Sequence, residues 1–247
     1  MPALCLFALG LSALFLPALF AYVPPVSRPL NLAAALFLVA CASPASHAQQ
    51  PPSPPAPAAG PVVRPLANLA TQRIVVTPAY AMDRGDPLGW AAGIARPRAM
   101  LRQLDSAIVA EFDARGLGES WYFAPQLERA YRLNSTYAAD PYLLAESPLR
   151  GRKPEVGKTY GEPLATQLRT MIALQDGARY VILPVELRFE KVGDGPEGRA
   201  VLTLVLVDAR TTEFRWVHEV ASDPAPAFGP AVLASLAWHF ADLVISP

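Results

Sequence analysis

Apolar positions after residue 66 repeat with the two-residue period of strands in several segments. Residues 73–77 predict a short strand that ends at Pro78, and residues 200–207 are apolar at both odd and even positions. We therefore expect residues 200–207 to form a central strand that is buried on both faces. The continuously apolar segment 180–183 leads into an alternating segment that ends at residue 190, with Pro184 between them. Because proline lacks an N–H donor, Pro184 predicts an edge position or a bulge.

Other segments have apolar side chains at spacings of three and four, which is typical of amphipathic helices. The clearest stripe predicts a helix that begins near Pro97 and ends at Gly116, and it consists of Leu101, Leu104, Ile108 and Phe112. Further helices are predicted from Pro125, over residues 164–172 and from Pro230.

Placed in chain order, these segments predict a fold class. Residues 121–123 are a short strand, and residues 214–220 alternate as an exposed strand does. The order is strand, helix, strand, helix, helix, three strands, helix. It predicts an α/β sandwich of two or three layers, with one mixed sheet of about five strands and flanking helices.

The N-terminal region, residues 1–48, predicts export. Arg28 is followed by an apolar run that ends in the sequence LVAC at residues 38–41. A basic residue, an apolar stretch and small residues before a cleavable position are the features of a bacterial export signal. The LVAC sequence resembles a lipobox, in which Cys41 is lipidated and becomes the new N-terminus. The alternative is ordinary signal cleavage between Ala48 and Gln49, which leaves a soluble secreted protein.

Residues 1–22 precede that signal and carry no charge. We interpret them as lying upstream of the true translation start, which we place near Val23 or Val26. The alternative is a transmembrane helix, because about 20 apolar residues span a bilayer. An export n-region without Lys or Arg is unusual, which favours the first interpretation.

A proline-rich linker separates the signal from the folded part. Residues 49–65 contain prolines at 51, 52, 54, 55, 57, 61 and 65. Such a tract favours an extended, semi-rigid spacer. We expect residues 66–247 to form a single α/β domain, in which the turn-rich residues 134–160 are an irregular insertion.

Composition narrows the chemistry of the chain. Lys plus Arg equals Asp plus Glu at 21 each, so no net charge draws the chain to nucleic acid. Both cysteines, Cys5 and Cys41, lie in the N-terminal region. His218 is in phase with Phe214 and Trp216, so we expect it at the inner face or rim of the sheet rather than as a general base. We predict no catalytic residues, no metal site and no cofactor.

Three segments carry a resemblance to a known domain: residues 104–110 on the first long helix, 176–182 entering a strand, and 205–211 closing the next. The succession resembles the domain shared by the curli secretion protein CsgG, the lipoprotein activators of penicillin-binding proteins and the amino-terminal domain of TolB. The resemblance implies an anticodon-binding-like fold and a non-catalytic interaction platform. Pro184 and Thr212 depart from the pattern, since the family often has glycine at both positions.

Export, a spacer and a scaffold-like fold together predict a function. We expect a lipid-anchored protein on the periplasmic side of the envelope, with the outer membrane as the candidate anchoring membrane. It would bind an unknown envelope protein by its sheet edge or by residues 134–160. The membrane contact would be the N-terminal lipid or apolar segment. The alternatives are an envelope-located hydrolase and a small-ligand-binding protein.

Overall fold

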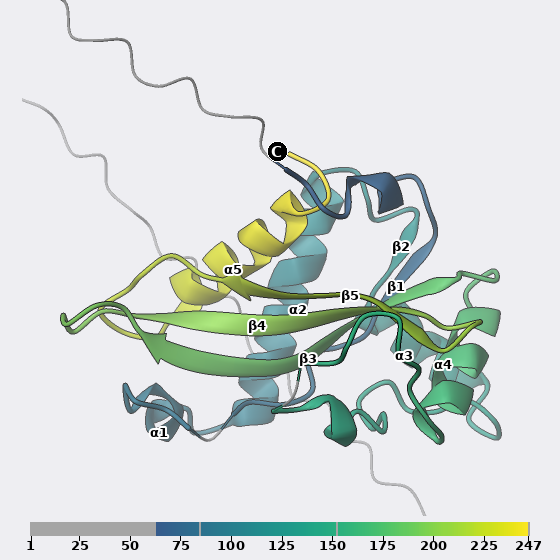
Figure 1. The fold of residues 1–247 in the computed structure, drawn as a ribbon, viewed down its shortest axis with the longest axis horizontal. Coiled ribbons are helices and arrows are strands. Elements are labelled where there is room, and N and C mark those ends of the chain that lie inside the picture. The colour runs from purple at the N-terminus through teal and green to yellow at the C-terminus, as the bar shows by residue number, and fades with distance from the viewer. Residues whose placement is uncertain (1–62, 84, 152, 247) are drawn as a thin grey trace, which may run out of the picture. The chain divides into compact units, whose positions relative to one another are not determined.

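One mixed five-stranded sheet, in the order β2-β1-β3-β4-β5, organises the fold (Figure 1). The computed structural model describes residues 63–246 except residues 84 and 152. The strands are β1 (Ile74–Val76), β2 (Trp121–Tyr122), β3 (Tyr180–Lys191), β4 (Gly198–Asp208) and β5 (Glu213–Ala221). Strand β1 is parallel to β2 and β3, whereas β3, β4 and β5 are antiparallel. The predicted α/β class with one mixed sheet is confirmed.

Helices cover both faces of the sheet. One face packs against α2 (Pro97–Ala114) and α5 (Pro230–Asp242), and the other against α3 (Ala124–Leu133) and α4 (Leu164–Ala173). Figure 1 shows α2 and α5 beside one another, and α3 and α4 gathered near one end of the sheet. The short helices are η1 (Ala67–Leu69), α1 (Trp90–Gly93) and η2 (Ser147–Leu149). No helix in the described part of the chain is both long and apolar enough to cross a membrane.

Aromatic packing joins α2, β2 and α5. The ring of Phe112 lies 5.0 Å from Trp121, 5.3 Å from Phe123 and 5.1 Å from Phe240 between centroids. All four side chains are buried. Pro97 and Pro230 each occupy the first position of a helix, where a missing N–H leaves no intrahelical bond unmade.

A bulge in β3 changes which side chains face which helices. Val185 is an extra residue between the paired positions Pro184 and Glu186. Before the bulge, Leu183 packs on the α4 side, and after it Leu187 packs on the α2 side. The bulge expected at Pro184 is therefore present, in an interior strand rather than at an edge.

A second irregularity, in β5, corrects the expectation for His218. Leu206 pairs with Trp216 and Val207 pairs with Phe214, so Arg215 is the extra residue. Phe214 therefore points toward α4, while Trp216 points toward the opposite face. His218 is exposed and stacks on Trp216, with 5.1 Å between ring centroids. Its expected phase with Phe214 is wrong because an alternating pattern does not reveal an inserted residue.

The segment between α3 and α4 is held to the sheet by backbone hydrogen bonds. Gly157 donates to the Phe214 carbonyl at 2.8 Å, and Phe214 donates to the Lys158 carbonyl at 2.9 Å. Tyr160 donates to the Thr212 carbonyl at 2.9 Å. Residues 157–160 therefore cover the start of one edge of the sheet, the outer edge of β5.

Candidate functional site

A groove of about 420 Å³ lies between the first half of α2, the chain that leaves β1, and the segment after α3. Its volume falls in the range of small-ligand sites. Polar and aromatic side chains predominate in its lining, which consists of Ala79, Tyr80, Arg98, Leu101, Arg102, Asp140, Tyr142 and Leu143.

Two arginines form the α2 wall of the groove. Arg98 and Arg102 are one helical turn apart and exposed, and the guanidinium of Arg102 lies 5.1 Å from the ring centroid of Tyr142. Among the described residues, no carboxylate oxygen lies within 4.0 Å of either guanidinium. The first turn of α2 contains no acidic residue. Because the positive end of a helix dipole favours anions, positive side chains here contribute least to the stability of the helix.

A buried carboxyl group lies behind this wall. Asp105 is 7% exposed, and its Oδ1 accepts a 2.7 Å hydrogen bond from the Ala79 N–H. Its Oδ2 has no hydrogen-bond partner among residues 63–246 other than 84 and 152. Burial raises the pKa of Asp105 to about 7, although the Ala79 hydrogen bond and the Arg102 charge act to lower it. Asp105 is therefore partly protonated at neutral pH.

A second buried carboxyl group, that of Glu146, lies in the segment after α3. Its side chain is fully buried, and neither Oε atom has a hydrogen-bond partner in the described part of the chain. Burial raises the pKa of Glu146 to about 8, against the opposing effect of the Arg150 charge. The Arg150 guanidinium lies 4.6 Å from the ring centroid of Tyr80, which lines the groove.

These protonation states leave the groove positively charged. Its lining carries two arginines and one carboxylate, that of Asp140, and Oδ1 of Asp140 accepts the Tyr142 N–H at 2.9 Å. The partly protonated Asp105 adds less than one negative charge from behind the wall. The positive charges around the groove therefore outnumber the negative ones, so the groove can attract an anion.

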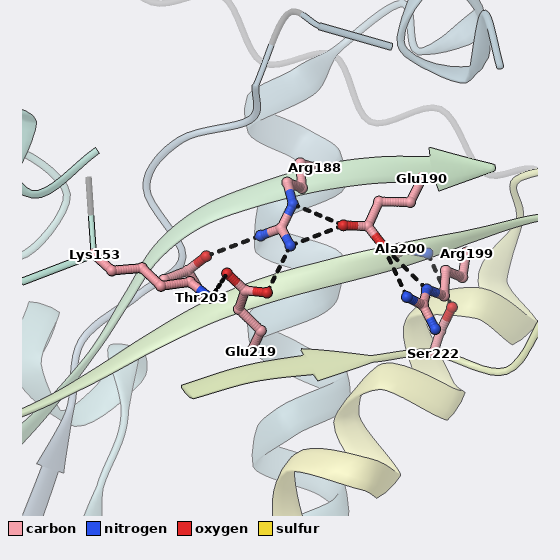
Figure 2. A network of polar contacts seen from close by, with 8 residues as sticks. All are labelled: Lys153, Arg188, Glu190, Arg199, Ala200, Thr203, Glu219 and Ser222. Atoms are coloured by element: carbon pink, nitrogen blue, oxygen red, sulfur yellow. Dashed lines mark hydrogen bonds and ion pairs between the residues drawn. The ribbon is translucent and has the colours of Figure 1, made fainter. Parts of the chain in front are cut away.

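A separate polar network crosses β3, β4 and β5 (Figure 2). The Arg188 guanidinium donates to Glu190 and Glu219, each at 2.8 Å, and to Thr203 at 3.2 Å. Arg199 pairs with Glu190, and Lys153 pairs with Glu219, both at 2.9 Å. The hydrogen bond from Lys153 lowers the pKa of Glu219. Each charged group in this network has a partner of opposite charge. The network therefore attaches Lys153, and with it the segment after α3, to the sheet.

Exposed apolar side chains are frequent at the end of α3 and in the segment after it. Six large hydrophobic residues are exposed in the described part of the chain, and four of them fall within residues 133–156. These four are Leu133 at 76%, and Tyr137, Leu143 and Val156 at 63% each. Leu143 also lines the groove, so the groove and the apolar segment adjoin.

The site residues predicted from sequence lie elsewhere. Cys41 and the cleavage position between Ala48 and Gln49 fall outside the described residues, as does the linker up to residue 62. Among residues 63–246, apart from 84 and 152, no three His, Cys, Asp or Glu side chains gather to hold a metal ion. Sequence reasoning missed Asp105 and Glu146. The available signal for Glu146 was the short apolar run of residues 143–145 directly before it.

Comparison with known proteins gives only distant similarities. No protein-family model and no curated protein matches this chain. The PelC dodecamer from Paraburkholderia phytofirmans is similar in two crystal forms, at 14% and 12% identity and TM-scores of 0.33 and 0.34. These matches cover 71% and 72% of this chain and 91% of the PelC chain. Lipoprotein GNA1162 from Neisseria meningitidis is similar at 14% identity and a TM-score of 0.25, over 60% of this chain and 77% of that one. No family model supports the resemblance to the CsgG, activator and TolB domain, and at these TM-scores the function has to be argued from the chain's own residues.

Proposed function

We propose that this chain is an exported envelope protein whose folded domain is a non-catalytic interaction domain, and that residues 133–156 bind a partner protein. The observation that carries the proposal is that four of the six exposed large hydrophobic residues of the described chain fall within this one stretch of sequence. Large exposed apolar patches typically mark protein interaction sites, and we propose that these four side chains form one.

The segment is also held in a fixed position, which favours binding. The ion pair between Lys153 and Glu219 and the backbone bonds of residues 157–160 attach it to β5. A surface that is ordered before binding loses less conformational entropy when a partner docks. Tyr137 adds a large apolar area with few rotatable bonds, as is common at the centres of interfaces.

Site-specific crosslinking in the native envelope tests the proposal. A photoreactive phenylalanine analogue at position 137 should capture one protein in a defined band, and the same analogue at position 238 should not. The analogue at position 156 should capture the same protein, and the triple variant Leu133→Ser, Tyr137→Ser, Leu143→Ser with the analogue at position 156 should lose that band. Val63→Ser is the matched control, because Val63 is an apolar residue with 83% exposure outside the segment. An unchanged band in the triple variant would contradict the proposed surface.

The envelope location rests on the LVAC sequence and the proline spacer behind it. We expect radiolabelled palmitate to enter the wild-type protein and not the Cys41→Ser variant. A mature protein that starts at Gln49 would instead establish the soluble secreted form. The spacer, at about 3 Å per residue, would hold the domain several tens of ångströms from an anchored Cys41.

A further inference from the structure

Arg98 and Arg102, the two arginines that line the groove, have no anionic partner in the described structure. The other residues around the groove leave space for an anion beside them. Arg98 and Arg102 lie on the same face of α2 because residues four apart in a helix are neighbours. Both line the cavity, and their guanidinium groups present several N–H donors to it. The arginines of the network on β3 and β4, Arg188 and Arg199, are by contrast paired with carboxylates (Figure 2).

Three features of the groove favour an organic anion over a simple ion. The cavity of about 420 Å³ is much larger than a phosphate or carboxylate group needs. Tyr80 and Tyr142 line it with aromatic surface, and Leu143 adds an apolar side chain at its rim. A ligand with an oxyanion at one end and a ring or carbon chain at the other would therefore match both parts of the lining.

The two carboxyl groups near the groove, those of Asp140 and Asp105, repel such an anion only weakly. Asp140 uses one carboxylate oxygen to accept the Tyr142 N–H. Burial raises the pKa of Asp105 to about 7, so its charge is reduced near neutral pH. The positive end of the α2 dipole adds to the field of the arginines.

We propose that the groove between α2 and residues 140–143 binds a small organic oxyanion, a carboxylate or a phosphate ester, through Arg98 and Arg102, with its ring or chain against Tyr142. The guanidinium forks hold the oxyanion by charge-assisted hydrogen bonds. Asp140, Tyr142 and Leu143 also belong to residues 133–156, so the groove lies at a border of the proposed partner-binding segment.

A set of three sugars that share one ring tests the proposal. D-glucuronate carries a carboxylate, D-glucose 6-phosphate carries a phosphate and D-glucose carries neither. In NMR titrations of the intact protein at low salt, we expect at least one of the two anions to bind with a Kd below about 10 mM, and we expect glucose not to bind. Comparison of the two anions distinguishes a carboxylate site from a phosphate site. Failure of both anions, or equal binding of glucose, would overturn the proposal.

Substitutions on α2 test which residues hold the anion. Arg98→Gln and Arg102→Gln should each weaken binding by at least about tenfold, because each loses charge-assisted hydrogen bonds. Arg96→Gln is the matched control, since it removes one positive charge from the same end of the helix at a position that does not line the cavity. We expect it to bind within about threefold of the wild type, as a change in distant charge alone would allow. An equal loss in Arg96→Gln, or no loss in the other two variants, would show a diffuse electrostatic effect and refute a built site.

Discussion

Truncation of Leu204 provides the sharpest test of the sheet and its core. Leu204 lies in β4 between Pro184 of β3 and His218 of β5, and it is 0% exposed. Leu204→Ala removes three carbon atoms, worth about 2.4 kcal/mol at about 0.8 kcal/mol per buried carbon. A residual cavity of about 50 Å³ adds about 1.2 kcal/mol at about 24 cal/mol per Å³. We therefore expect the free energy of unfolding to fall by about 3.6 kcal/mol.

Urea denaturation followed by circular dichroism measures this change. The midpoint should fall with an unchanged slope, because the substitution alters stability and not the area exposed on unfolding. Leu133→Ala is the matched control, since Leu133 is 76% exposed and should change the free energy by less than about 0.5 kcal/mol. A loss below about 1 kcal/mol in Leu204→Ala would contradict a position at the centre of the sheet.

Three further predictions concern Glu146, Thr212 and the chain's need for cofactors. Burial raises the pKa of Glu146 from 4.5 to about 8, so the folded state holds its proton more tightly and the wild type should lose stability as pH rises from about 4.5 to about 8. Urea midpoints measured between pH 5 and 9 should fall less with pH in Glu146→Gln than in the wild type. The exposed control Glu155→Gln should behave as the wild type does. An equal dependence of the midpoint on pH in all three proteins would refute the raised pKa. Thr212 has φ of 60°, so Thr212→Gly should relieve about 1–2 kcal/mol of backbone strain and add about 0.5–1 kcal/mol of unfolded-chain entropy. We expect a net gain in stability of about 0.5 kcal/mol, or about 1–2 °C in Tm. A fall in Tm of more than about 1 °C in calorimetry would contradict this. Finally, we expect chelator or reductant to leave the Tm unchanged, and a shift of more than a few degrees would reveal a bound metal ion or a disulfide.

The sequence predicts the regular elements well because their apolar periods are local. The stripe from Leu101 to Phe112 and the continuous run at residues 200–207 specify a helix and a central strand without reference to the rest of the chain. Proline positions also locate helix starts, as at Pro97 and Pro230. The inserted residue Arg215 was not predictable, because alternating side chains look the same on either side of a bulge.

The groove was not predictable because its parts are distant in sequence. Asp105 looks like a polar position at the border of an apolar stripe, and its partner, the Ala79 N–H, lies 26 residues earlier. Glu146 falls in a turn-rich segment where charge is expected to be solvated, yet tertiary packing buries it completely. Arg98 and Arg102 line a common groove with Tyr142 only when the segment after α3 packs beside α2.

The covered edge of β5 limits the aggregation of this protein through its sheet. An exposed, unpaired strand edge is a template on which another chain can add, and it leads to fibres or swapped dimers. Here one border of the sheet is β2, which has two residues, and the other is blocked at its start by residues 157–160. The remainder of β5 carries the charged Arg215 and Glu219. Many copies can thus be crowded together with little tendency to fuse into a continuous sheet.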